Sequence, residues 1–335
     1  MQLNEIWFLI VGFLFIGYFV LDGFDFGVGI ALPFLAKDDT DRRVLINTVG
    51  PVWDMNETWV LVAGASLFAA FPDWYASLFS GFYLALLLIL LALIARGVSF
   101  EYRGKSESAK WRKTFDWMIF AGSVVPALLW GVAFANIVQG VPLDAKHNFT
   151  GTLLTLLNGY GLLGGLVTLA LFFTYGLIFI SLKTEGEIRV RARNWATRVG
   201  VVTVLLAASF LLWTLFAHFS VLGLVLTAVA ALSLVAALLM NIKGREGVSF
   251  SLMVITVATA VGALFSALFP NVLPSTVDPL SNSLTIANAS SSPYTLTVMT
   301  WVVVFSLPLV LLYQGWTYWV FKKRVSRDSI PVGSH

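Results

Sequence analysis

Apolar runs of about 20 residues recur along nearly the whole chain and are separated by short polar segments. A run of this length crosses about 30 Å of hydrocarbon as an α-helix. The pattern predicts nine membrane-spanning helices, near residues 6–34, 56–72, 75–97, 115–137, 158–182, 196–217, 220–241, 250–270 and 295–320. We therefore expect an all-α membrane protein, with two four-helix bundles plus one peripheral helix.

The composition agrees with a chain that is mostly embedded in the membrane. Of 335 residues, 58% are hydrophobic and 12% are charged, whereas soluble domains carry about 25% charged residues. The spans leave no room for a separate soluble domain, so residues 1–321 are predicted to form a single polytopic domain and residues 322–335 a cytoplasmic tail. The first apolar run lacks the basic start and small-residue cleavage site of a signal peptide, so we expect it to stay as a span.

The distribution of positive charge predicts the orientation. With nine spans, all of the 21 Lys and Arg residues except Lys146 fall on one side of the membrane or at its edge. The positive-inside rule then places the N-terminus outside and the C-terminal tail in the cytoplasm. The outer segments 138–157 and 271–294 are predicted to be ordered caps or contact surfaces, with disorder as the alternative.

Several kinds of chemistry are excluded by what the sequence lacks. Without cysteine there is no disulfide framework, iron–sulfur cluster or thiol catalysis. His147, His218 and His335 are far apart, so we expect no metal bound by this chain alone. The basic residues are explained by topology, so no nucleic-acid partner is expected.

Acidic residues near the membrane core are the candidate functional groups, because an ionisable side chain there costs about 2.5–3.5 kcal/mol. Asp22 and Asp25 are three residues apart and lie on one face of the first predicted span. Asp54 and Glu57 have the same spacing at the start of the second. The predicted depth of all four is toward the cytoplasmic side.

Two further charges extend this layer. Asp116 begins the fourth predicted span, and Arg96 ends the third at a similar depth. Five acids and one arginine thus indicate a proton route from the cytoplasm, with Arg96 pairing with Asp25 or Asp116. The alternative is that these charges only pin the helices together, and a capping role is equally open for Asp54 and Glu57.

Small residues accompany the acids on the first span. Gly23 and Gly27 form a Gly-x-x-x-Gly pattern, which lets the backbone of another helix approach closely. We therefore expect tight helix packing against the acid-bearing face.

Longer motifs resemble subunit II of the cytochrome bd quinol oxidases. The similar segments are Asp22-Gly-Phe-Asp-Phe-Gly-Val-Gly29, the stretch from Asp41 to Trp59, Leu67-Phe-Ala-Ala-Phe-Pro72 and Arg96-Gly-Val-Ser-Phe-Glu-Tyr-Arg103. The resemblance is dense over the first 145 residues and thinner afterwards, in the same order throughout.

The resemblance implies a partner and cofactors that the residues alone do not. Family members pair with a larger subunit I, which carries haem b and haem d, oxidises quinol and reduces oxygen with protons from the cytoplasm. Asp25, Arg96 and Asp116 match the family's intramembrane charges, Asp54 matches the acid associated with proton uptake, and Asp22 and Glu57 match motif positions. Some members hold a structural quinone in subunit II, and small accessory subunits and lipid are further partners implied.

The resemblance therefore implies the smaller subunit of a respiratory quinol:oxygen oxidoreductase in a bacterial or archaeal plasma membrane, not catalytic by itself. Two alternatives from other classes stay open. A proton-coupled secondary transporter would use the same acids, but it would place its site at mid-membrane on broken helices. A purely structural partner would use the acids only as helix pins.

Overall fold

A computed structural model describes residues 2–330. Nine long helices dominate this part of the chain: α1 (Leu3–Leu35), α3 (Trp53–Ala70), α5 (Tyr83–Tyr102), α6 (Ala109–Gln139), α8 (Gly159–Lys183), α9 (Gly186–Ala217), α10 (Val221–Ile242), α11 (Glu246–Leu268) and α13 (Pro293–Val320). The shorter elements are α2 (Asp39–Val49), α4 (Pro72–Gly81), η1 (Arg103–Lys105), α7 (Leu153–Leu156), β1 (Asn271–Leu273), α12 (Pro279–Asn282), β2 (Leu284–Thr285) and η2 (Arg327–Ser329).

Eight of the long helices within residues 2–330 are apolar and long enough to cross a membrane. The exception is α3, in which Asp54, Asn56 and Glu57 make the first half polar. The all-α membrane class is confirmed, whereas the count of nine spans and the orientation stay predictions. The predicted span 75–97 is divided, because α4 ends at Gly81 and α5 begins at Tyr83.

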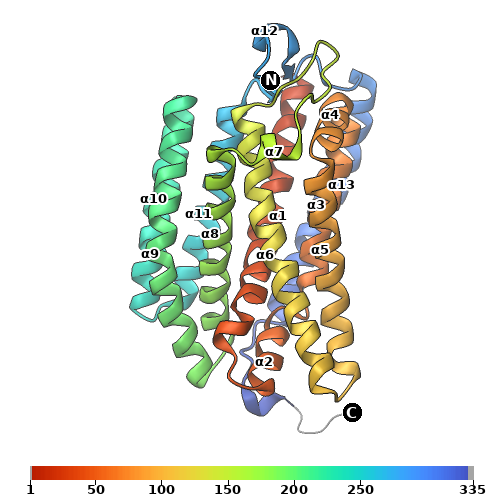
Figure 1. The fold of residues 1–335 in the computed structure, drawn as a ribbon. Helices are drawn as coiled ribbons and strands as arrows, with labels where there is room; N and C mark the ends of the chain where they lie inside the picture. The colour runs from red at the N-terminus through yellow and green to blue at the C-terminus, as the bar shows by residue number, and fades with distance from the viewer. Residues whose placement is uncertain (1, 331–335) are drawn as a thin grey trace.

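The long helices pack as two groups of four. Helices α8, α9, α10 and α11 form a closed bundle, and α1, α3, α5 and α6 form the other. The two bundles join where α8 packs against α1 and α6, and Figure 1 shows α9 and α10 at the far edge from α3 and α5. Helix α13 packs on α1 and α3 and is mostly exposed, as expected for a peripheral helix.

Close backbone contact between α1 and α8 confirms the expected tight packing beside the acids. A Cβ atom on Gly27 would lie 1.9 Å from the carbonyl oxygen of Phe172, and one on Gly176 would lie 2.2 Å from the carbonyl carbon of Gly27. Neither position has space for a side chain, so the acid-bearing turn of α1 is fixed against the second bundle.

The two segments predicted as outer caps are ordered and pack on each other. Val141 donates its N–H to Pro274 O at 3.0 Å, and the Nδ1 atom of His147 lies 2.9 Å from Asn282 O. Strands β1 and β2 pair antiparallel in the second segment. This cap lies at the end of the molecule opposite α2 (Figure 1).

Candidate functional site

A buried ion pair joins Arg96 of α5 to Asp22 of α1. Both terminal nitrogens of Arg96 donate to Asp22 Oδ1, at 3.2 and 3.3 Å, and both side chains are 0% exposed. Glu57 of α3 lies beside them, with Oε1 at 3.8 Å from Arg96 Nη1. Three helices that are separate in sequence therefore meet at one guanidinium group.

Aromatic rings flank this guanidinium, and a glycine lies against the base of the Arg96 side chain. The Cζ atom of Arg96 lies 4.6 Å from the ring centroid of Phe26 and 5.4 Å from that of Phe100. A Cβ atom on Gly122 of α6 would lie 2.8 Å from Arg96 Cβ, so α6 packs directly behind it. Aromatic faces attract cations, so these walls help to hold a positive charge among apolar helices.

Asp25 is held by a different set of residues, centred on Asn56. The buried Asn56 amide donates to Asp25 Oδ2 at 2.7 Å and to Leu21 O at 3.1 Å. Its carbonyl oxygen accepts from Gln314 Nε2 and from the Tyr318 hydroxyl, each at 2.9 Å. Because Gln314 and Tyr318 belong to α13, the peripheral helix reaches into the site.

Asp22, Asp25, Glu57 and Arg96 form what we call the acid cluster. Within residues 2–330, Asp22 Oδ2, Asp25 Oδ1, Glu57 Oε1 and Arg96 Nε have no hydrogen-bond partner. Buried polar atoms of proteins are normally satisfied. The cluster holds three carboxyl groups and one guanidinium, so a single positive charge balances one of them and protons can neutralise the others.

The expected pairing of Arg96 with Asp25 or Asp116 is wrong. Helices α5 and α6 run antiparallel after the turn at η1, so Gly122 lies opposite Arg96 and Asp116 lies opposite Arg103. The Nε atom of Arg103 donates to Asp116 Oδ1 at 2.5 Å. Asp116 therefore belongs to an ion network nearer the helix ends and not to the acid cluster.

Asp54 is also outside the acid cluster. It is exposed in the first turn of α3, one turn before the half-buried Glu57. The predicted layer of five acids thus separates into three buried or half-buried members, one exposed acid and one member of the ion network.

Sequence reasoning missed most of this ion network. Asp41 is fully buried and accepts from Arg191 at 2.6 Å and from Arg327 at 2.5 Å. Arg103 also bonds to Asp39 at 2.6 Å. The signal available in the sequence was the acidic run at the start of α2, but its partners lie on η1, α9 and the tail.

The first residue of that run caps α2. Asp38 accepts the backbone N–H of Asp41 at 2.8 Å and a hydrogen bond from Arg327 Nη2 at 2.7 Å. These bonds, with the backbone one first, hold the pKa of Asp38 below its ordinary value. The tail thus docks on α2 through charge.

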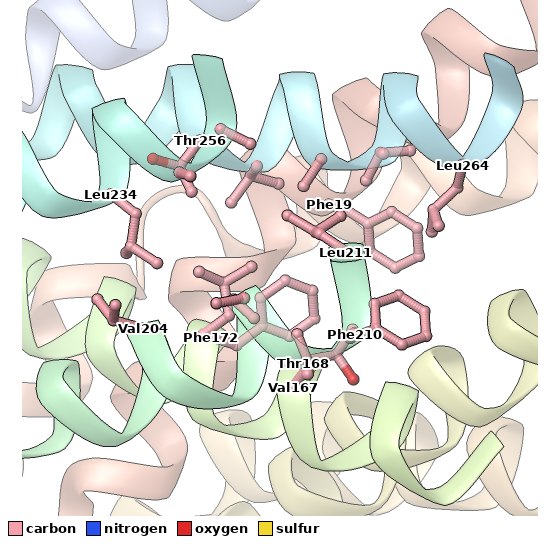
Figure 2. A pocket seen from close by; sticks show the side chains of 18 of the residues that line it. Phe19, Val167, Thr168, Phe172, Val204, Phe210, Leu211, Leu234, Thr256 and Leu264 are labelled. Carbon is pink, nitrogen blue, oxygen red and sulfur yellow. The ribbon is translucent and has the colours of Figure 1, made fainter. Parts of the chain in front are cut away.

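An apolar cavity of about 100 Å³ lies among α1, α6 and the second bundle. Figure 2 shows its lining, which includes Phe19, Phe172, Leu211 and Leu264. Its two hydroxyl groups are already engaged, since Thr168 donates to Ala127 O at 2.6 Å and Thr256 donates to Leu252 O at 2.9 Å. The cavity suits a small apolar group rather than a polar headgroup.

Residues 2–330 contain no group of three or more His, Asp or Glu side chains arranged to hold a metal ion. His147 lies in the outer cap and His218 follows the end of α9. His335 lies outside the described residues. The two described histidines do not fit a haem site, because they lie on separate elements and neither belongs to a group of metal-binding side chains.

Helices of membrane-spanning length that enclose buried titratable groups define a polytopic membrane protein. The family described as cytochrome bd terminal oxidase subunit II matches residues 3–321. The chain belongs to this family.

Two similar curated proteins are second subunits of oxidases. The chain is 41% identical over 330 residues to cytochrome bd ubiquinol oxidase subunit 2 of Bacillus subtilis, covering 97% of each chain. It is 38% identical over 371 residues to cytochrome bd-I ubiquinol oxidase subunit 2 of Escherichia coli, covering 99% of this chain and 98% of that one. The solved bd oxidase of Geobacillus thermodenitrificans shares the fold, with a TM-score of 0.78 at 16% identity over 96% of this chain and 100% of that one.

Proposed function

We propose that this chain is the smaller subunit of a terminal respiratory oxidase that oxidises quinol and reduces oxygen to water. Its relatives are named as second subunits of cytochrome bd ubiquinol oxidases, at 38–41% identity over nearly their whole length. A first subunit is therefore its partner, in the plasma membrane of a bacterium, where this chain is a multi-pass component. Catalysis belongs to the assembled complex.

The second part of the proposal is that the acid cluster conducts protons. The observation that carries it is the set of buried carboxyl oxygens without a protein partner beside a single arginine. The proposed route begins at Asp54, which is exposed, and continues to the half-buried Glu57 one helical turn further along α3. It ends at Asp22 and Asp25, which are both buried. Carboxyl groups that are linked by water molecules can pass protons from one to the next.

Arg96 has a defined task in this proposal. Its guanidinium balances Asp22, so the pair stays ionised while Asp25 and Glu57 are available to exchange protons. Asp116 has no part in the proposed route, because Arg103 and Arg42 hold it in the ion network.

The cofactors are assigned to the partner. Haem b, haem d and the quinol that donates electrons are proposed to bind the larger subunit, where haem chemistry would reduce oxygen. A structural quinone and small accessory subunits remain part of the proposal without residues of this chain assigned to them. The engaged hydroxyls around the apolar cavity give a quinone carbonyl no free donor there.

Of the alternatives, the secondary transporter has the least support. Transporters of that type place the site on broken helices, whereas α1 carries Asp22 and Asp25 within one unbroken helix of 33 residues. Carboxyl substitutions that leave assembly intact distinguish proton conduction from the alternative in which the acids only pin the helices.

The test of the oxidase assignment is a reduced-minus-oxidised visible spectrum. The chain is purified from its native membrane in mild detergent with its partners retained. Bands of haem d and haem b that co-elute with a larger second chain are expected. A colourless chain that stays folded alone would contradict the assignment.

A further inference from the structure

A polar cavity of about 560 Å³, separate from the apolar cavity described above, lies where the end of α13 passes α8 and α11. Four cationic side chains line it, and we call it the basic cavity: Lys183, Lys322, Lys323 and Arg324. Its inner wall is aromatic, with Phe179, Phe250 and Tyr318. It thus combines a positively charged rim with an apolar floor.

The charge of the basic cavity is not balanced within its lining. Among the described residues that line it, none is Asp or Glu. Two other cavities at the same end differ in this respect. One, of about 550 Å³, contains Asp39, Glu107 and Asp116 beside its cations, and the other, of about 500 Å³, contains Asp41, Glu185, Glu187 and Asp328.

The positive-inside rule explains why Lys and Arg occur at this end of the helices. It does not explain why four of them converge on one cavity without carboxylates, while each of the two other cavities at this end contains at least three carboxylates. The difference is therefore local, and it favours an anionic occupant.

The hydrogen bonds of Lys183 and Arg324 go to uncharged backbone carbonyl groups, so they do not neutralise the positive charge of the cavity. Lys183 donates to the backbone carbonyls of Phe321 and Lys323, and Arg324 Nη1 donates to Thr184 O at 3.1 Å. Glu246 Oε2 lies 4.0 Å from Arg324 Nη2, but Glu246 does not line the cavity.

The apolar floor indicates what kind of anion fits. Phe179 is buried, and Phe250 and Tyr318 are half-buried. The cavity borders α13, of whose most apolar 18-residue stretch only 6% is buried within this chain. An anion with an apolar part can therefore place that part along α13.

We propose that the basic cavity binds an anionic phospholipid, with its phosphate among the four cations and its acyl chains along α13. Clusters of basic residues between helices at the cytoplasmic side are suited to such headgroups. The site is connected to the acid cluster, because Tyr318 lines the cavity and donates to Asn56, which donates to Asp25.

The test is a lipid titration of the purified complex in nanodiscs or detergent. Phosphatidylglycerol is expected to bind and to raise the thermal unfolding temperature, whereas phosphatidylcholine has no such effect. The double variant Lys322→Gln/Lys323→Gln is expected to bind phosphatidylglycerol about 30-fold more weakly, from roughly 1 kcal/mol for each lysine.

A matched control removes two cations elsewhere at the same end. Lys110→Gln/Lys113→Gln makes the same charge change, and Lys113 lines the cavity that contains Asp116, so less than a twofold loss is expected. The double variant Lys322→Arg/Lys323→Arg keeps the charge and is expected to keep binding, which separates lost binding from misfolding.

Equal losses in the two glutamine variants, or no loss in either, would overturn the proposal. Inorganic phosphate added alone is expected not to displace the lipid. If phosphate at millimolar concentration stabilises the complex as well as phosphatidylglycerol does, the occupant is a soluble anion and the lipid proposal is wrong. The lipid titration measures lipid binding, whereas the visible spectrum tests the oxidase assignment. Each proposal can therefore fail without the other.

Discussion

Arg96 and Asp22 are both fully buried, so each depends on the other for its charge balance. Removing one partner of a buried pair costs more than removing both, because a lone charge then remains among apolar side chains. The aromatic walls formed by Phe26 and Phe100 reduce this cost without removing it.

Asp22→Asn is therefore expected to destabilise the complex by about 3–5 kcal/mol, measured by thermal unfolding in detergent. The exposed Asp73→Asn, the same change at the other end of the first bundle, should have almost no effect. Asp22→Asn/Arg96→Met should recover part of the loss. If the double variant is less stable than Asp22→Asn, the ion pair is not the reason.

Asn56 links α13 to Asp25 with all of its polar atoms engaged. Asn56→Ala leaves Gln314, Tyr318 and Asp25 without this partner, at about 1–3 kcal/mol for a buried group left unsatisfied. A lower unfolding temperature is expected, and Asn194→Ala, on the exposed face of α9, should leave it unchanged. Equal unfolding temperatures for the two variants would rule out the Asn56 link.

At the scale of the helices, α1 holds the acids in place through its contact with α8. Gly27→Ala inserts a methyl group where Phe172 O lies 1.9 Å away, so we expect the assembled complex to be lost or strongly depleted. Gly64→Ala, in α3 where nothing lies within 4 Å, should be neutral or slightly stabilising. The measurement is the yield of complex by size-exclusion chromatography, and a normal yield of Gly27→Ala would contradict the tight contact.

The helices themselves were predictable from apolar periodicity, because eight of them are long runs with few charges. The partners of the charges were not. Spacing placed Asp22 and Asp25 on one face, but the register of α5 against α6 decides that Arg103, and not Arg96, meets Asp116. Likewise, Asn56 is an ordinary polar residue in sequence, and only α13 packing on α3 reveals its role.

At the scale of the whole molecule, α2 and the C-terminal tail connect the two bundles at one end. Asp41 on α2 binds Arg191 from α9 and Arg327 from the tail. Charge therefore helps to hold these elements together at this end of the molecule.

Arg327→Gln is expected to release residues 321–330, seen as faster amide hydrogen exchange in this segment, whereas Arg198→Gln on the exposed face of α9 should not. The pKa of Asp38 is lowered, so its contribution is complete above the ordinary value of about 3.9 and is lost as the pH falls through the lowered value. Docking should therefore be unchanged from pH 7 to about 5 and weaken below about 4. Release of the tail between pH 7 and 5 would contradict the ion network as its cause.

The most direct test of the account is turnover by the assembled complex carrying Asp25→Asn, with Asp73→Asn as the matched carboxyl control. The amide keeps the shape of the side chain but cannot take up and release a proton near neutral pH. We predict normal haem content and normal assembly, with oxygen consumption reduced at least about tenfold and proton uptake slowed in parallel. Full oxygen consumption by an assembled, haem-replete Asp25→Asn complex would show that the acid cluster only pins the helices.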